Sequence, residues 1–439
     1  MIRLIRGKQR KRTRSDKVKI LFLFKRHGMG DDLPRSVNLR LREIPINLAK
    51  SGFDVQVVCL DHSSNKNSII NDFDEKSRIT VPWVSVGGGK PKDESLISEI
   101  FKNEEYNGSR KKEFNGVGSR AITTATLMFY SINSFMRTRS FRLPSLVRYL
   151  HVAERTARKN NVDLIIGGSD SVYVVAAAWL ANRMKVPCII DLMDNFEYFN
   201  SGIKVKLMDL YRDAVKNADQ VVCVSNELSE YVKEKYKRKH GVTVVENGID
   251  SSLFYPMEKH LARETLGLPI NAQIIGNAGA LNVNRGITDL YRAFEIIASE
   301  NDNIHLVLAG PKGKGVTIPK HPRVHYFGVL PRQEVNRLIN SLDVAVICNR
   351  DVSYVSYGFP QKTYEIIASR TPLVAACIGP MKNFMVDYQD YLYLPERPES
   401  LVDAINKQLK DQYVIEMSVP TWEDQAAIFN KLINNLSLR

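Results

Sequence analysis

A lysine and a glutamate three residues apart are the most informative pair in this chain. Lys362 and Glu365 follow Pro360 within the segment 358–374, and a spacing of three places both side chains on one helical face. Proline suits the first turn of a helix, where unpaired amides and the positive dipole end favour an anion such as a diphosphate. A carboxylate one turn further on can accept hydrogen bonds from a ribose diol. The segment predicts a helix that holds a sugar nucleotide; an amphipathic helix with a solvated lysine and glutamate is the alternative.

Two aspartates form a second candidate group. Asp191 and Asp194 follow the apolar run 188–190, which is typical of a buried strand, and the sites of α/β proteins lie at strand ends. Either carboxylate could take a proton from a hydroxyl as a general base; the alternative for each is a cap on the next helix. His27 and Gly30 lie in a glycine-bearing loop after the first strand. We expect His27 to face the cleft and Gly30 to contact the sugar nucleotide.

Short apolar runs alternate with segments of helical periodicity in the first half of the chain. One such helix is expected at 39–50, where Gly52 closes it. Alternation of this kind indicates a parallel sheet with right-handed crossovers. The expected strands are 19–24, 55–60, 79–86, 164–166, 188–190 and 219–225.

A second alternating series begins at 274–276. It continues with strands 304–309, 324–327, 344–348 and 372–376, helices 287–299, 332–340 and 360–370, and a last helix at about 421–435. The fold class is therefore α/β, with two doubly wound, Rossmann-like domains that face each other across a cleft. We expect a basic tail at 1–16, domains at 17–240 and 241–420, and a C-terminal helix within 421–439 that packs back toward the N-terminal domain.

Composition narrows the class of protein. The 439 residues are 44% hydrophobic and 25% charged, which is typical of a globular chain and long enough for two domains. The five cysteines are scattered, without metal or redox spacing, so reduced buried thiols in a cytosolic protein are expected. No apolar run approaches the roughly 18–20 residues of a membrane span.

The excess of positive over negative charge is confined to the first half. Residues 1–240 carry 43 Lys and Arg against 27 Asp and Glu, whereas residues 241–439 carry 19 against 21. Within 107–150, eight bases and one acid are interleaved with aromatic and aliphatic residues. Such a segment is suited to lie on an anionic membrane; helices packed on the sheet with solvated arginines are the alternative. No nucleic-acid-binding motif is present, so nucleic acid is not an expected partner.

Four stretches, taken in order, resemble one known family. They are 218–228, 244–256, 279–287 and 358–374. Over most of residues 18–430 the chain resembles the GT-B-fold glycosyltransferases of the large retaining family 4. By this resemblance Arg285 contacts the donor diphosphate, Glu365 binds the ribose and Lys362 is the lysine that precedes it. A guanidinium there would stabilise the leaving group. The resemblance implies a UDP- or GDP-linked donor, no further cofactor and no bound metal.

The stretch 189–195 is similar to one in GT-B enzymes that build bacterial polysaccharides, including glucuronosyltransferases in which such an aspartate is the base. Asp191 and Asp194 are therefore the catalytic candidates. Three positions depart from the family pattern: Tyr357 replaces the first of its paired glutamates, Ala280 an arginine and Gly168 a histidine.

The sequence thus predicts a cytosolic glycosyltransferase, peripheral on the inner face of the membrane. It would move a sugar from a nucleotide diphosphate donor to a lipid-linked or polysaccharide acceptor in bacterial surface glycan synthesis. The donor would sit on the C-terminal domain and the acceptor would enter over the basic N-terminal domain. Two alternatives remain: a nucleotide-sugar 2-epimerase of the same fold, and a non-catalytic sugar-nucleotide-binding partner subunit.

Overall fold

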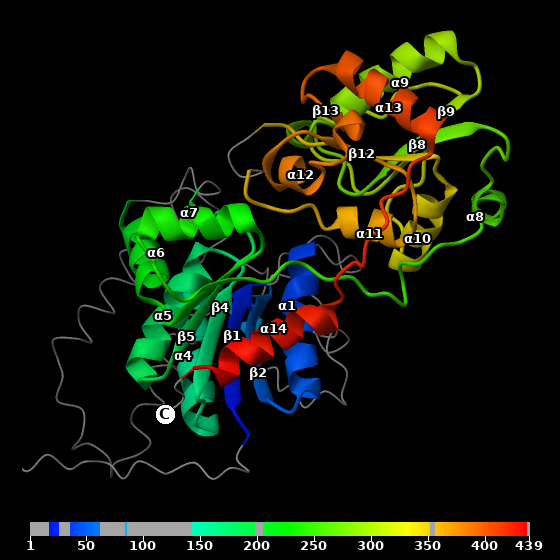
Figure 1. Cartoon of the computed structure of the whole chain (residues 1–439). Coiled ribbons are helices and arrows are strands. Elements are labelled where there is room, and N and C mark those ends of the chain that lie inside the picture. Colours follow the sequence, from blue (N-terminus) through cyan, green and yellow to red (C-terminus); the bar gives the residue numbers. More distant parts are fainter. Residues whose placement is uncertain are drawn as a thin grey trace, which may run out of the picture.

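The chain forms two α/β domains, each built on a parallel sheet (Figure 1). The computed structural model describes residues 17–25, 36–61, 84–85, 143–197, 205–351 and 356–436. The predicted fold class is confirmed. Several sequence predictions lie outside the described residues: the basic tail 1–16, the loop with His27 and Gly30, and most of the strand 79–86 and of the segment 107–150.

The N-terminal sheet has seven described strands in the order β3-β2-β1-β4-β5-β6-β7, and all neighbours are parallel. The strands are β1 (Lys19–Lys25), β2 (Asp54–Asp61), β3 (Val84–Ser85), β4 (Leu164–Gly168), β5 (Cys188–Leu192), β6 (Gln220–Cys223) and β7 (Val242–Val244). The helices that connect them are α1 (Ser36–Lys50), α4 (Leu143–Asn160), α5 (Ser171–Met184), α6 (Val205–Asn217) and α7 (Asn226–Tyr236). The sequence predicted a domain limit at residue 240. Because β7, which begins at Val242, pairs with β6, this sheet extends past that limit.

Strand alternation decides which helices cover which face. On β1, Leu21 and Leu23 belong to the same apolar cluster as residues of α4, α5, α6 and α7. Ile20, Phe22 and Phe24 point to the other face, where they share a cluster with residues of α1 and of the C-terminal helix α14 (Trp422–Asn434). Figure 1 shows α14 lying beside α1. The last helix therefore completes the core of the N-terminal domain.

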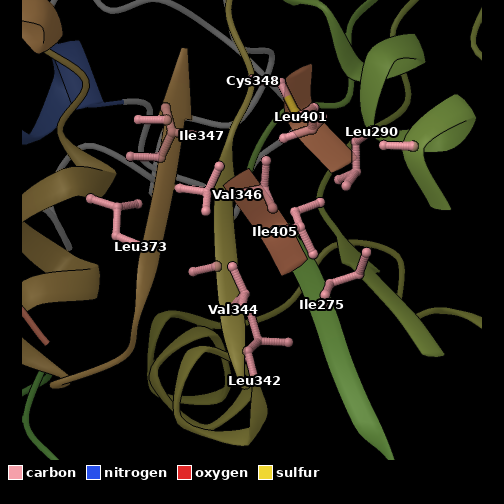
Figure 2. Packing of buried hydrophobic residues seen from close by; sticks show 14 of the residues in the cluster. Ile275, Leu290, Leu342, Val344, Val346, Ile347, Cys348, Leu373, Leu401 and Ile405 are labelled. Carbon is pink, nitrogen blue, oxygen red and sulfur yellow. The ribbon is translucent and has the colours of Figure 1, made fainter. Parts of the chain in front are cut away.

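The C-terminal sheet has six described strands in the order β10-β9-β8-β11-β12-β13. They are β8 (Gln273–Ala278), β9 (Ile304–Ala309), β10 (Val324–Tyr326), β11 (Val344–Ile347), β12 (Leu373–Ala376) and β13 (Leu392–Tyr393). The helices are α8 (Lys259–Leu266), α9 (Ile287–Glu300), α10 (Arg332–Ser341), α11 (Lys362–Ala368), α12 (Gly379–Phe384) and α13 (Pro398–Asp411), with 3-10 turns η3 (Val283–Arg285) and η4 (Gln389–Tyr391). Figure 2 shows β8 and β11 packed against Leu401 and Ile405 of α13.

Two crossings join the domains, and they pair with each other. We call residues 245–250 the first crossing and residues 419–422 the second. The amide of Ile249 donates to the carbonyl of Pro420 at 2.9 Å, and the amide of Trp422 donates to the carbonyl of Ile249 at 3.3 Å. A Cβ on Gly248 would lie 2.5 Å from the backbone of residues 421 and 422. This close approach requires glycine.

Both sheets have a point where the strand order reverses. The reversal lies between β1 and β4 in one sheet and between β8 and β11 in the other. Ligands of doubly wound proteins bind outside the carboxyl ends of the strands at such points. Among the described residues, no helix has the length and apolar character needed to span a bilayer.

Candidate functional site

A pocket opens at the reversal point of the C-terminal sheet. It encloses about 320 Å³, including the space at its open mouth. Its wall combines the ends of β8 and β11 with η3 and the start of α11. The lining residues are Asn277, Ala280, Arg285, Ile287, Ile347, Cys348, Asn349, Pro360 and Lys362. Polar and cationic groups over an apolar floor suit an anionic ligand with a polar body.

Lys362 is one of the two cationic residues that line the pocket. Its Nζ donates to Oδ1 of Asn277 at 3.4 Å, while Nδ2 of Asn277 donates to the carbonyl of Val346 at 2.7 Å, which fixes the amide. Gly279 has φ +147°, and a Cβ there would lie 2.6 Å from the lysine Nζ. Burial, with the charge of Arg285 nearby, lowers the pKa of Lys362 to about 8. Burial makes the ammonium form less stable, so an anion bound beside it would stabilise the charge.

Arg285 lies at the mouth of the same pocket. The side chain of Asn282 accepts from the amide of Asn284 at 2.9 Å and starts the turn η3, and Gly286 ends it with φ +72°. This turn presents an exposed guanidinium next to Lys362. Two cations on separate segments thus converge at the carboxyl end of the sheet.

Glu365 lies beside the pocket and is not one of its lining residues. It pairs with Arg332 of α10 at 3.4 Å, and the Arg332 guanidinium lies 5.2 Å from the centre of the Phe254 ring. Burial raises the pKa of Glu365, against the opposing charges of Arg332 and Lys362. Lys362 and Glu365 both lie on α11, which begins at Lys362, two residues after Pro360.

The structure gives the two candidate aspartates different environments. Asp191 is only 4% exposed, and its carboxylate accepts from Nε and Nη2 of Arg40 at 2.8–3.2 Å. Its oxygens are already committed to a buried ion pair, which is the geometry of a structural group. We therefore assign Asp191 to the scaffold.

Asp194 faces the other domain. Its Oδ1 accepts from the amide of Asn195 at 2.7 Å. A Cβ on Gly358 of the C-terminal domain would lie 3.5 Å from its Oδ2. Burial raises the pKa of Asp194 to about 7, although the nearby charge of Arg285 acts in the opposite direction. A carboxyl with this pKa gains and loses a proton near neutral pH, as a general base requires.

The positions that depart from the family pattern have structural explanations. Tyr357 of the C-terminal domain contacts the N-terminal domain. Its carbonyl accepts from Oγ of Ser225 at 2.6 Å, and its ring centre lies 4.9 Å from that of Tyr231. Gly168 has no room for a side chain, because a Cβ would lie 2.8 Å from the carbonyl of Asp191. Ala280 lines the pocket without filling it.

Sequence reasoning missed Asn277 and Asn349, both buried polar residues of the pocket. Each comes at or just after the end of an apolar strand run, which was the available signal. Of the sequence candidates, the structure brings together Asp194, Arg285 and Lys362, with Glu365 adjacent. It places Asp191 in the interior.

Comparisons with known proteins agree with this geometry. Residues 117–253 match the family described as Glycosyltransferase Family 4, and residues 272–411 match the family described as Glycosyl transferases group 1. The chain is 25% identical over 243 residues to TuaC of Bacillus subtilis (strain 168), a protein named as a teichuronic acid biosynthesis glycosyltransferase. It is 27% identical over 217 residues to the D-inositol 3-phosphate glycosyltransferase of Stackebrandtia nassauensis.

These curated relatives are matched over about half of their length. The alignments cover 54% of this chain and 59% of TuaC, and 45% of this chain and 47% of the Stackebrandtia protein. Solved structures match over nearly the whole fold. Sucrose-phosphate synthase from Thermosynechococcus elongatus has a TM-score of 0.64 at 15% identity, covering 95% of this chain and 98% of its own.

Anabaena HepE, in a complex with UDP and glucose, has a TM-score of 0.63 at 15% identity, covering 95% of this chain and all of its own. At such identities the structural matches establish the shared fold alone. The first match extends through the first crossing to residue 253, and the second covers residues 272–411 of the C-terminal domain. Together these findings identify the chain as a member of the family 4 type of GT-B glycosyltransferases.

Proposed function

We propose that this protein transfers a sugar from a UDP- or GDP-linked donor to a lipid-linked or polysaccharide acceptor in bacterial surface glycan synthesis. One observation carries the proposal. Asp194, a partly buried carboxyl of the N-terminal domain, faces Gly358 of the C-terminal domain and lies near the charge of Arg285. Arg285 and Lys362 both line the pocket of the C-terminal domain. A base for the acceptor hydroxyl and a cationic site for the leaving diphosphate each promote glycosyl transfer.

The donor side follows from the pocket. The diphosphate would be bound by Lys362 and Arg285, and the ribose by Glu365. As the bond between the anomeric carbon and the diphosphate breaks, negative charge grows on the leaving oxygen. The two cations stabilise that charge in a site partly shielded from water. These side chains supply the neutralising charge, so we expect transfer to proceed without a metal ion.

The acceptor side follows from Asp194. Its carboxylate would accept the proton of the acceptor hydroxyl while that oxygen forms the new bond to the anomeric carbon. The proton passes to Asp194 and the nucleotide diphosphate departs, so atoms and charge balance. The segment at Gly358 faces Asp194 and would limit the water that competes with the acceptor.

The acceptor class rests on relatives and on charge. TuaC is named for teichuronic acid biosynthesis, which is consistent with a surface glycan. The excess of bases in residues 1–240 is consistent with a protein on the anionic inner face of the membrane. An acceptor anchored in that membrane would then be presented to the N-terminal domain.

Radiolabelled donors test the activity directly. Purified protein is incubated with UDP- and GDP-sugars and with membrane lipid extract, with and without EDTA. Transfer of label to the lipid fraction, unaffected by EDTA, is the expected result. Conversion of the donor to its 2-epimer without acceptor would instead support an epimerase. Donor binding without turnover under any of these conditions would support a non-catalytic binding subunit.

A further inference from the structure

A line of polar contacts runs from the N-terminal sheet to α11, through the first crossing. It begins at Arg40 of α1, which is 1% exposed. Besides holding Asp191, this guanidinium donates through Nη1 to the carbonyls of Val245 and Glu246, both at 2.8 Å. A single buried arginine thus ties the end of β5 to the first crossing.

The line continues on the other side of the crossing. The carboxylate of Glu246 accepts from the hydroxyl of Tyr364 on α11 at 2.7 Å. Tyr364 is 2% exposed, and its ring packs 4.8 Å from that of Phe359. In addition, Nε2 of Gln361 donates to the carbonyl of Gly248 at 2.6 Å. The start of α11 is therefore held to the crossing at two points.

The members of this line come from four segments: α1, β5, the first crossing and α11. Arg40 also lies 6.0 Å from the ring centre of Phe429 on α14, so the helix that follows the second crossing packs on the same arginine. Buried charge pairs are costly to desolvate and contribute little net stability. Their value here lies in fixing one arrangement of the segments.

We propose that Arg40, Glu246 and Tyr364 are positioning residues that couple the donor helix α11 to the end of β5. Nucleotide bound at Lys362, on the same helix as Tyr364, then stabilises the position of Asp194 opposite Gly358. This coupling rests on the proposed function for its nucleotide, whereas the polar line itself is a property of the fold. Binding energy at the donor pocket is thereby used to position the base.

Tyr364→Phe is the sharpest test, because it removes one hydroxyl and keeps the ring. The matched control is Tyr391→Phe: Tyr391 is in the same domain, is 9% exposed and donates to Oδ2 of Asp411 at 2.9 Å. Hydrogen exchange is followed by mass spectrometry in both variants and in the wild type, each alone and with saturating UDP or GDP.

Without nucleotide, Tyr364→Phe should raise exchange about tenfold in the first crossing and also in residues 188–197 of the N-terminal domain. The control should raise exchange only around residues 391 and 411. With nucleotide, wild-type residues 188–197 should become protected, and Tyr364→Phe should lose most of that protection. Glu246→Met, which keeps the length of the side chain but removes the carboxylate that accepts from Tyr364, should reproduce both effects.

Exchange that rises only within 356–370 in Tyr364→Phe would overturn the coupling, whatever nucleotide does. Wild-type protein that binds neither UDP nor GDP would instead overturn the proposed donor. In that case the nucleotide-free comparison still decides whether the polar line connects the two domains.

Discussion

Gly358 of the C-terminal domain lies directly against the carboxyl of Asp194 in the N-terminal domain: a Cβ at residue 358 would come 3.5 Å from Oδ2. A methyl group at residue 358 would thus be in van der Waals contact with the proposed base, and glycine leaves that space open. Gly358→Val should push the two domains apart at this point. We expect it to lower transfer while leaving UDP affinity within about threefold of wild type.

Asp194→Asn should lower transfer by roughly 10²–10⁴-fold, the usual contribution of a general base, with donor affinity retained. The folded state raises the pKa of Asp194 to about 7, so it binds a proton more tightly than the unfolded state does. Its ionisation therefore lowers stability as pH rises from about 4 to 7. The variant should accordingly be at least as stable as wild type at pH 8 in a thermal melt.

Asp191→Asn is the matched comparison, since it makes the same chemical change three residues away. It would leave the buried Arg40 guanidinium without its counter-charge, which costs on the order of 3 kcal/mol. A lower midpoint in urea is expected, with a smaller loss of transfer per folded molecule. Full transfer activity in both variants would remove the base assignment.

The pH dependence of UDP binding should report Lys362. Burial lowers the pKa of this lysine to about 8, so its ammonium is present below that pH and is lost above it. UDP affinity measured by calorimetry should fall as pH rises from 7.5 to 9.5, approaching tenfold per pH unit at the upper end. Lys362→Met should bind more weakly and show a flat profile over this range. A sloping profile in that variant would point to another group.

Most of the fold follows from periodicity along the chain. The strand expected at 304–309 matches β9, because a short apolar run predicts a strand buried on both faces, and only His305 within it is not fully buried. Among the elements that were not predicted are β13 and α13. β13 has only two residues, too few to show a period, and is fixed by pairing with β12. The helix α13 does carry a readable pattern, with Leu401, Ala404 and Ile405 on its buried side.

The candidate site could be predicted only in part, because its geometry comes from contacts distant in sequence. Asp191 lies within β5 and Asp194 just after it, and nothing in their spacing indicates which of the two is the base. The alternation of side chains along the strand distinguishes them. Asp191 lies on the same face as Ile189 and Met193, which is the face that α1 covers with Arg40. Tyr357 could not be assigned either, since its partner Ser225 lies 132 residues earlier.

Membrane association is a separate prediction, drawn from the charge of residues 107–150. Each base near an anionic surface contributes about 1 kcal/mol and is screened by salt. The protein should sediment with anionic vesicles at low salt, bind weakly to neutral vesicles and be released at high salt. Neutralising Arg137, Arg139, Arg142 and Arg148 together should release it without affecting UDP binding. The test is repeated without residues 1–16, and equal binding to neutral and anionic vesicles would contradict it.

Arg285→Ala should reduce turnover more than it reduces nucleoside binding. The guanidinium lies at the pocket mouth beside Lys362, where charge builds on the diphosphate as the glycosidic bond breaks. Calorimetry with uridine or guanosine should show little change, whereas affinity for the diphosphate and the rate of transfer should fall. Arg350→Ala is a suitable comparison: Arg350 donates to Thr288 at 3.2 Å and is not one of the pocket-lining residues. Equal losses for nucleoside and diphosphate would count against the role of Arg285.

Glu365→Ala should weaken UDP or GDP binding by about 10- to 150-fold, because a hydrogen bond to a charged group contributes roughly 1.5–3 kcal/mol. The substitution also frees Arg332, which now pairs with Glu365 at 3.4 Å, so lost binding must be separated from a changed partner. Glu334→Ala provides the control: it removes the partner of Arg337 on the same helix as Arg332. Calorimetry with the diphosphate and with its 2′,3′-dideoxyribose analogue then isolates the ribose contact. Wild type should prefer the ribose form, Glu334→Ala should keep that preference, and Glu365→Ala should lose it. A preference that survives in Glu365→Ala would show that another group binds the diol.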